Sequence, residues 1–249
     1  MTPVAIQSIL GLVQGVTEWF PISSTGHLAL AERFLGLTED LSYDVFLHIA
    51  SLAVMLVFFR REIASLFMRS VIRPQRETRR EVGYLAVTTL LTFGIGFALT
   101  PVEGFLRTPT WIAAGLAVNA AVLFMVRGLN GPRSIDLRSA VVIGLVQGLA
   151  VVPSVSRSAL TISLALLMKM KRDEAFRYSF LAAIPAIAGA IVLTVPKLHW
   201  DPVYLVGFAI TAVVSYLALV LLRIIVRRDY LHWFWVYNVI LAVLVLIYA

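Results

Sequence analysis

The sequence predicts an all-α polytopic membrane protein, and three observations point to this class. Hydrophobic residues make up 60% of the 249 residues and charged residues only 14%, with a mean hydropathy of +0.90; a soluble domain is about 45–50% apolar and about 25% charged. Several apolar stretches are long enough to cross a bilayer, and the basic residues concentrate between particular stretches. Such a chain has too little polar surface for a soluble globule, so its net charge of +7 does not indicate nucleic-acid binding or disorder.

Six apolar stretches are predicted to form transmembrane helices, because a bilayer core of about 30 Å is crossed by roughly 20 apolar residues. The expected spans are residues 44–59, 82–100, 109–126, 175–195, 203–225 and 233–249. The first and the last of these stretches are close to the lower limit of length for a transmembrane helix.

Two further apolar segments, residues 3–37 and 137–170, are interrupted near their centres by a proline followed by hydroxyl residues. The interruptions fall at residues 21–27 and 153–158. Each half-segment has only about 14 residues and is too short to span the bilayer comfortably. We therefore predict two re-entrant helical hairpins, whose irregular backbone must be surrounded by protein or by a wet cavity.

The distribution of Lys and Arg supports this layout through the positive-inside rule. If each hairpin enters and leaves on one side, 17 of the 21 basic residues fall on the same side of the membrane. Arg33, Arg107 and Lys197 fall on the other side, and Arg157 lies within the membrane. We expect a multi-pass protein of the plasma (inner) membrane, with both termini and the mouth of the first hairpin on the extracytoplasmic side.

A five-residue sequence occurs twice in the chain. Gly-Leu-Val-Gln-Gly at residues 11–15 recurs at residues 144–148, and each copy leads into a loop that contains proline and serine. We predict one membrane domain, residues 1–249, built as an inverted-topology repeat of about residues 1–126 and about 137–249. The two loops can then meet near the midplane, where transporters with this organisation bind substrate.

The partners expected from this layout are lipids. Membrane lipids surround the spans, and no nucleic-acid partner is expected for so apolar a chain. A homodimer stays open as an alternative, because the small residues Gly94, Gly96 and Gly115 could pack helices within one chain or between two chains.

The first candidate functional group is Glu18. It lies in an apolar segment four residues after Gln14, so the two side chains share one helix face. A carboxylate inside the bilayer costs several kcal/mol unless it is paired or hydrated, which makes it a candidate for function. Glu18 is therefore either the structural partner of an arginine, or a metal ligand or general base.

The second candidate is Arg157, the one arginine expected inside the membrane, flanked by Ser156 and Ser158 at the start of a half-helix. Guanidinium groups match phosphate oxygens, and a helix N-terminus offers free N–H groups to an anion. Arg157 could also simply neutralise Glu18. The two roles are compatible if a cation and a phosphate lie between the two side chains in the occupied site.

The loop of the first hairpin supplies Ser23, Ser24, Thr25 and His27. At least one of the hydroxyl residues is expected only to cap a helix. His27, an imidazole beside serines in an apolar setting, suits general acid–base work or nucleophilic attack. His48 in the first span faces the same region, and we expect it to contact a ligand or to be structural with about equal weight.

Together these residues favour an anionic, phosphate-bearing ligand that is handled inside the membrane. A divalent cation, Mg²⁺ or Ca²⁺, would let Glu18 face a phosphate without repulsion and could polarise a phosphoryl oxygen. The chain contains no cysteine, which excludes disulfides, thiolate catalysis and structural zinc.

Two motifs resemble the signatures of the undecaprenyl-diphosphate phosphatase family, the bacitracin-resistance type. Residues 14–18 (QGVTE) lead into residues 21–27 (PISSTGH) and are similar to an (E/Q)xxxE motif followed by an SSTGH loop. Residues 153–161 (PSVSRSALT) are similar to the second motif, PGxSRSxxT. Residues 178–181 with Pro185, the six spans and the two hairpins also fit, so the resemblance covers essentially the whole chain.

The resemblance implies metal-dependent hydrolysis of the terminal phosphate of an undecaprenyl-type polyprenyl diphosphate, which regenerates the monophosphate lipid carrier for cell-wall (peptidoglycan) synthesis. By motif position it implies metal binding by Glu18 and Gln14, and a phosphate clamp at Arg157. Ser24 and His27 match the residues of nucleophilic attack or proton transfer, and whether serine, histidine or water attacks stays open. The neighbouring polar residues are expected to contact substrate: Ser23, Thr25, Ser156, Ser158, Thr161 and His48.

Three residues depart from the family pattern. Gln14 stands at the first motif position and leaves one certain carboxylate, Ser154 replaces a glycine and restricts the turn, and Ala159 stands where many members have a second glycine. These departures bear on metal affinity and on activity. An alternative function is a polyprenyl-phosphate transporter or flippase without hydrolysis, which the inverted repeat and its midplane site also favour.

Overall fold

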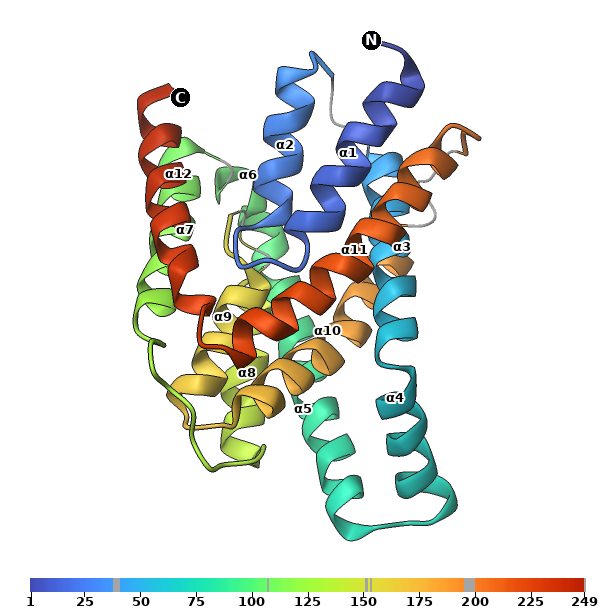
Figure 1. The fold of residues 1–249 in the computed structure, drawn as a ribbon, viewed down its shortest axis with the longest axis vertical. Coiled ribbons are helices and arrows are strands. Elements are labelled where there is room, and N and C mark those ends of the chain that lie inside the picture. The colour runs from blue at the N-terminus through green and yellow to red at the C-terminus, as the bar shows by residue number, and fades with distance from the viewer. Residues whose placement is uncertain (38–40, 107, 151, 153, 195–199, 249) are drawn as a thin grey trace.

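The structure, a computed structural model, describes residues 1–37, 41–106, 108–150, 152, 154–194 and 200–248, and within them the chain is helical without a β-strand. Figure 1 shows both termini at one end of the molecule and the connection between α4 and α5 at the other. The α-helices are α1 (Pro3–Thr17), α2 (Ser24–Phe34), α3 (Leu41–Phe58), α4 (Arg60–Phe67), α5 (Arg76–Leu99), α6 (Glu103–Leu106), α7 (Pro109–Phe124), α8 (Leu137–Leu149), α9 (Arg157–Leu167), α10 (Arg172–Thr194), α11 (Tyr204–Arg227) and α12 (Phe234–Tyr248).

Three helices in the described part of the chain are long and apolar enough to cross a membrane, namely α5, α10 and α11. They coincide with the expected spans 82–100, 175–195 and 203–225. A fourth is present if α3 and the following helical segment Arg60–Ile72, bent by 66° relative to it, are one span. Helices α7 and α12 are apolar but have 16 and 15 residues. The all-helical, multi-pass class is confirmed, and six spans remain a prediction.

Both segments predicted as hairpins are helix–loop–helix pairs, α1 with α2 and α8 with α9. Helix α1 ends before Pro21, because proline lacks a backbone donor and clashes with the preceding turn. Figure 1 shows the loop between α1 and α2 turning back inside the molecule rather than at its end. Residues 151 and 153 of the second loop lie outside the described residues. That the two pairs are re-entrant in a membrane stays a prediction.

The repeated five-residue sequence packs in the same way at both of its positions. A Cβ atom at Gly11 would lie 2.7 Å from the carbonyl oxygen of Gly207 on α11, and one at Gly144 would lie 2.9 Å from the backbone of α5. Thr211 donates a hydrogen bond to the carbonyl of Gly11 (3.0 Å), and Thr92 donates one to the carbonyl of Gly144 (3.3 Å). The glycines thus allow α1 to pack closely on α11, and α8 to pack closely on α5. The inverted orientation of two repeats stays a prediction.

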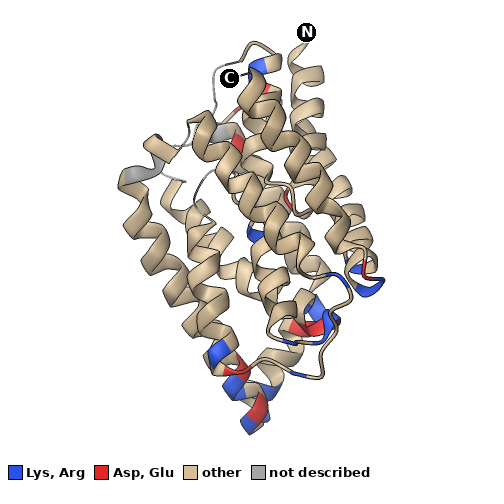
Figure 2. Ribbon diagram, turned by 90° about the vertical axis from the view of Figure 1, so that its left-hand side faces the viewer, with Lys and Arg blue, Asp and Glu red and all other residues tan. Residues whose placement is uncertain are grey.

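The charged side chains are segregated, as the sequence predicts. Figure 2 shows most Lys and Arg gathered at the end opposite the N-terminus. Ion pairs join them to acids there, including Arg177 with Glu81 (2.6 Å) and Arg172 with Asp229 (2.7 Å). Large apolar side chains such as Leu90 of α5 are exposed instead of buried, which suits helices that face lipid. Which end lies in the cytoplasm stays a prediction.

Candidate active site

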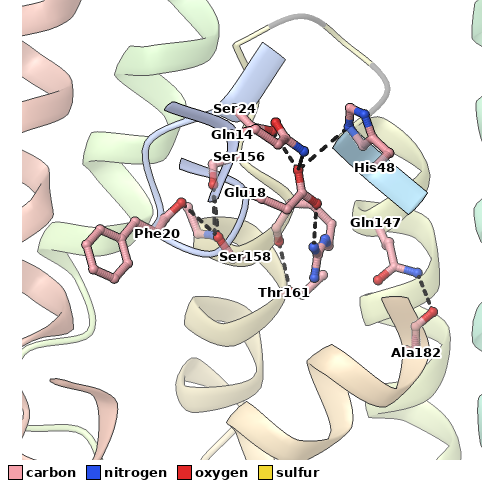
Figure 3. Close-up of polar contacts among 12 residues, drawn as sticks. Gln14, Glu18, Phe20, Ser24, His48, Gln147, Ser156, Ser158, Thr161 and Ala182 are labelled. Atoms are coloured by element: carbon pink, nitrogen blue, oxygen red, sulfur yellow. Dashed lines mark hydrogen bonds and ion pairs between the residues drawn. The ribbon is translucent and has the colours of Figure 1, made fainter. Parts of the chain in front are cut away.

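Glu18, directly after α1, is the point where polar groups from several helices converge (Figure 3). Its Oε1 accepts a hydrogen bond from Nη2 of Arg157 at 3.2 Å. Its Oε2 accepts from Oγ of Ser24 at 2.8 Å and from Nε2 of Gln14 at 3.3 Å. The residue is 9% exposed. The isolated acid seen in the sequence is therefore a buried carboxylate that is paired with the predicted arginine from the other hairpin.

Arg157 is the first residue of α9, where the free backbone N–H groups of a helix favour an anion. Besides the contact with Glu18, its guanidinium lies over the ring of Phe180, with Cζ 5.3 Å from the ring centre. Its Nη1 is buried and has no hydrogen-bond partner among the described residues. A buried donor without a partner costs about 1–3 kcal/mol, and a ligand in the cavity that Arg157 borders would remove this cost.

The loop of the first hairpin delivers its hydroxyl groups because of an unusual backbone turn. Ser23, just before α2, has a left-handed backbone with φ of +67°, and Ser24 opens the helix with its Oγ on Glu18. Ser23, Ser24 and Thr25 all border one cavity. The three hydroxyl residues that the sequence assigned to this loop thus border the same cavity as the carboxylate, and Ser24 contacts it directly.

The two candidate histidines have different surroundings. His48 donates from Nδ1 to the carbonyl of Asp44 (2.8 Å), which turns Nε2 toward Glu18, 3.7 Å from its Oε2. His27 donates from Nδ1 to the carbonyl of Ser23 (2.7 Å), and its Nε2 is 2.5 Å from the hydroxyl of Tyr237 on α12. His27 stacks on that ring and does not border the cavity. The structure thus places His48 close to the carboxylate of Glu18, whereas His27 lies against Tyr237 of α12.

Of the predicted polar residues in and after the second loop, one borders the cavity and two do not. Ser156 caps α9 by accepting from the N–H of Ala159 (3.3 Å) and also borders the cavity. Ser158 donates to the carbonyl of Phe20 (3.3 Å), and Thr161 donates to the carbonyl of Arg157 (2.8 Å). These last two side chains hold backbone in place and do not border the cavity.

Two buried asparagines, which the sequence analysis did not single out, hold the two loops. Asn119 of α7 donates to the carbonyl of Ser154 (2.8 Å) and accepts from the N–H of Ser156 (2.9 Å). Asn238 of α12 donates to the carbonyl of Pro21 (2.9 Å). The two side chains also meet, with Nδ2 of Asn119 3.2 Å from Oδ1 of Asn238. A lone amide in an apolar stretch was the available signal, because such a group needs a buried partner.

A cavity of about 890 Å³ adjoins Glu18 and Arg157. Glu18, Ser24, His48 and Arg157 border its polar end. Many of the other lining residues are apolar side chains of α5 and α10, such as Phe97 and Leu193, and polar residues such as Asp44, Thr92 and Gln147 also border the cavity. An amphipathic ligand with an anionic head fits this division.

Comparison with known proteins decides the family. Residues 7–244 match the family model described as Bacitracin resistance protein BacA. The chain belongs to the BacA family. An Undecaprenyl-diphosphatase of Korarchaeum cryptofilum (strain OPF8) is 35% identical over 257 residues, 98% of either chain. Proteins of the same name from Oceanobacillus iheyensis and Rubrobacter xylanophilus are 34% and 38% identical, over 96% and 95% of this chain and 94% and 95% of their own.

One departure of this BacA-family chain from the motif has a visible backbone consequence. Ser154, which stands where the motif has glycine, has a left-handed backbone with φ of +69°. An L-residue in that region costs roughly 1–2 kcal/mol. The turn therefore keeps the shape that glycine would adopt without this cost.

A hard divalent cation takes oxygen ligands, and the residue beside Glu18 with a buried carbonyl oxygen is Gln14. Oε1 of Gln14 is buried and has no hydrogen-bond partner among the described residues, while its amide nitrogen reaches Glu18. No cluster of three or more His, Asp or Glu able to hold an ion occurs in the described ranges. A cation here would share its shell with phosphate oxygens, as Mg²⁺ commonly does.

Proposed function

We propose that this chain is a polyprenyl-diphosphate phosphatase, which removes the terminal phosphate of an undecaprenyl-type diphosphate and leaves the monophosphate lipid carrier. BacA-family membership and relatives named Undecaprenyl-diphosphatase support this activity. The observation that carries it is the Glu18–Arg157 pair, which joins the two hairpins at the border of a largely apolar cavity. The pair suits a diphosphate head, and the apolar walls suit its prenyl chain.

The reaction follows from the positions of three side chains. Arg157 and the first N–H groups of α9 bind the terminal phosphate. Oγ of Ser24 donates to Glu18, so Glu18 is placed to take a proton from Ser24 or from a water molecule in its place. The activated oxygen attacks the terminal phosphorus, the bond from that phosphorus to the bridging oxygen breaks, and this oxygen leaves with the lipid monophosphate. If serine attacks, water then hydrolyses the phosphoserine.

A divalent cation, Mg²⁺ or Ca²⁺, belongs to the proposal. Glu18 and Oε1 of Gln14 are the oxygen donors that would hold it. When bound, it would offset the repulsion between carboxylate and phosphate and polarise a phosphoryl oxygen. Substrate contacts are assigned to the side chains that border the polar end of the cavity, namely Ser23, Thr25, Ser156 and His48. We place this end toward the extracytoplasmic side, with both termini.

Phosphate release from farnesyl and undecaprenyl diphosphate by purified protein in detergent, with and without EDTA, tests the proposal. We expect release that EDTA abolishes. Glu18→Gln and Arg157→Lys should each lower kcat/KM by about 100-fold or more, because each removes a group that acts on the transferred phosphate.

Glu81→Gln and Arg177→Lys are matched controls, because these residues form an ion pair at the opposite end of the molecule. Both controls should keep near-normal release. Full activity of Glu18→Gln or Arg157→Lys would overturn the mechanism. Folded protein that binds the lipid phosphate without hydrolysing the diphosphate would favour the transporter alternative.

A further inference from the structure

We propose that the end of the molecule opposite the termini carries a binding surface for the headgroups of anionic phospholipids. The surface is formed by residues 60–80, which comprise α4, the helical turn Met68–Ile72 and the start of α5. We call these residues the α4–α5 tip. Figure 1 shows the tip at the far end of the molecule from the termini, and Figure 2 shows Lys and Arg gathered at that end. The tip does not border the cavity around Glu18, so this inference does not depend on the proposed function.

The α4–α5 tip carries a positive charge that the protein does not neutralise. It contains seven arginines and two acids. None of the seven arginines forms an ion pair within the described residues. The ends of α10 and α11 differ, because Arg172, Arg177 and Arg227 are each paired with a carboxylate. The charge of the tip is therefore available to an anionic partner.

Three of the seven arginines border one hollow. This cavity of about 470 Å³ is lined by Arg76, Arg79, Arg80 and Pro74. Nε of Arg79 donates to the carbonyl of Ser70 (3.1 Å), which fixes the side chain across the turn. Its two Nη groups have no hydrogen-bond partner in the part of the chain that the structure describes. Guanidinium groups bind phosphate oxygens through paired N–H donors, so a phosphate in this cavity would meet three such groups.

Beside the arginines, the tip exposes an apolar face. Phe67, Met68, Val71 and Ile72 are between 49% and 60% exposed. Residues 67 and 71, like residues 68 and 72, are four positions apart, so the side chains lie on one side of the helical segment. Basic and exposed apolar side chains on one segment are typical of helices that lie between headgroups and acyl chains. A free anion would leave this apolar face in water, which favours a lipid as the occupant.

The length of α5 places the arginines at the depth of the headgroups. Its apolar part begins at Val82, and residues 76–81 precede it. These residues extend about 9 Å along the helix axis, and the headgroup region on each side of the hydrocarbon core is roughly 5–8 Å thick. The segment Arg60–Ile72 is bent by 66° from α3, so it leaves the direction of that helix. Both halves of the tip can therefore contact the headgroup layer.

Binding of phosphatidylglycerol and phosphatidylcholine to the purified full chain in non-ionic detergent tests the proposal. Each lipid carries a fluorescent group on an acyl chain, which leaves its headgroup unchanged. We expect Arg76→Gln/Arg79→Gln/Arg80→Gln to weaken phosphatidylglycerol binding by about tenfold or more, and phosphatidylcholine binding by about twofold or less. Unchanged phosphatidylglycerol binding in this variant, or equal binding of the two lipids by the native chain, would overturn the proposal.

Arg127→Gln/Arg133→Gln/Arg138→Gln is the matched control. It removes the same charge from three exposed arginines in and beside the connection between α7 and α8, which do not border the cavity of the tip. We expect it to change phosphatidylglycerol binding by about twofold or less. A similar loss in both triple variants would show that net charge, and not the tip, governs binding. Thermal unfolding checks that both proteins are folded.

A further variant distinguishes a lipid from other occupants. Phe67→Ser/Val71→Ser removes apolar side chains and keeps every arginine, and it should weaken phosphatidylglycerol binding by about threefold or more. Millimolar inorganic phosphate should not displace the lipid from the native chain. Displacement by phosphate, or full binding in the double variant, would assign the cavity to a free anion instead. A change of oligomeric state without a change in lipid binding would assign the surface to a second copy of the chain.

Discussion

The hairpins α1–α2 and α8–α9 share the sequence Gly-Leu-Val-Gln-Gly, but they use its glutamine differently. The first glycine packs on the partner helix in both, where a threonine hydroxyl donates to its carbonyl. Gln14 then donates to Glu18 in the site, whereas Gln147 donates to Thr92 (3.1 Å) and to the carbonyl of Ala182 (3.1 Å). The shared glycines therefore serve helix packing. The glutamine bonds to the carboxylate in the first hairpin, whereas in the second it anchors α10 and also borders the cavity.

The charges are divided between the same two hairpins. The first supplies the acid Glu18, and the second supplies Arg157. Each loop is also held by one asparagine from a helix outside its hairpin, Asn238 for the first and Asn119 for the second. A site that needs both signs of charge is thus assembled from two similar hairpins by changing few side chains.

The largest expected effect comes from separating the two charges. Glu18→Gln and Arg157→Gln should each lower the free energy of unfolding by about 3–5 kcal/mol, because each leaves an uncompensated buried charge. The double variant Glu18→Gln/Arg157→Gln should recover most of this loss, while phosphate release stays about 100-fold or more below normal in all three. Thermal unfolding in detergent and phosphate release measure the two properties separately.

The double variant also provides the internal control. If the double variant is no more stable to unfolding than the less stable single variant, Glu18 and Arg157 are not each other's main charge partner. Activity in the double variant would show that the clamp is not needed for hydrolysis.

The second effect concerns the asparagines. Asn119→Ala and Asn238→Ala should each lower the free energy of unfolding by about 1–3 kcal/mol, because each leaves buried backbone groups unpaired. The double variant should lose less than the sum, since the two amides are 3.2 Å apart. Asn119→Ala should mainly raise KM by loosening the loop before Arg157, whereas Asn238→Ala should mainly lower kcat by loosening the loop after Glu18. Steady-state kinetics test this split, and equal changes in both variants would contradict it.

Much of this arrangement is predictable from local sequence. Proline and serine mark where α1 and α2 separate, and a lone acid and a lone arginine in apolar segments predict a buried pair. Glu18 and Arg157 do meet, at 3.2 Å. The six spans were less predictable, since α7 and α12 are shorter than the apolar stretches that contain them.

The direction of individual side chains was not predictable. The sequence favoured His27 over His48 for the site, yet the ring of His27 lies against Tyr237, more than 200 residues away in the chain. Periodicity identifies the face of a helix but not the tertiary partner that fixes a ring. For the same reason, the lone Asn119 and Asn238 could not be assigned to particular loops.

A smaller, stabilising effect is expected at Ser23 and Ser154, the two serines whose φ is positive. Ser154→Gly should raise the free energy of unfolding by about 0.5–1 kcal/mol, because glycine removes the steric cost of positive φ. The gain is only partial, because glycine also makes the unfolded chain more flexible. Ser23→Gly should give a similar gain. Only Ser23→Gly should lower phosphate release, since Ser23 borders the cavity and Ser154 does not. A destabilised Ser154→Gly protein would mean that its side chain, and not its backbone, supports the loop.

An effect of similar size distinguishes the N-terminal caps of the two hairpins. Thr2 caps α1 by accepting from the N–H of Ala5 (3.3 Å), and Asp136 caps α8 by accepting from the N–H of Ser139 (2.7 Å). Hydrogen bonds from the hydroxyl and the N–H of Ser139, with smaller contributions from nearby arginines, lower the pKa of Asp136. Replacing either cap by alanine should cost about 0.5–1 kcal/mol at pH 7.

Only the Asp136 cap should depend on pH. The pKa of Asp136 is lower in the folded state than in the unfolded chain, where it is about 4. The charged carboxyl therefore stabilises the folded state above about pH 4, and this contribution is lost as the pH falls through the pKa of the folded state. The difference between the native chain and Asp136→Ala should therefore shrink when thermal unfolding is measured at about pH 3 instead of pH 7. The difference for Thr2→Ala should stay constant. Asp136→Asn, which keeps an acceptor without the charge, should show no pH-dependent cap. A constant cost of Asp136→Ala across this range would show that the charge does not contribute, and that the two hairpins begin with equivalent caps.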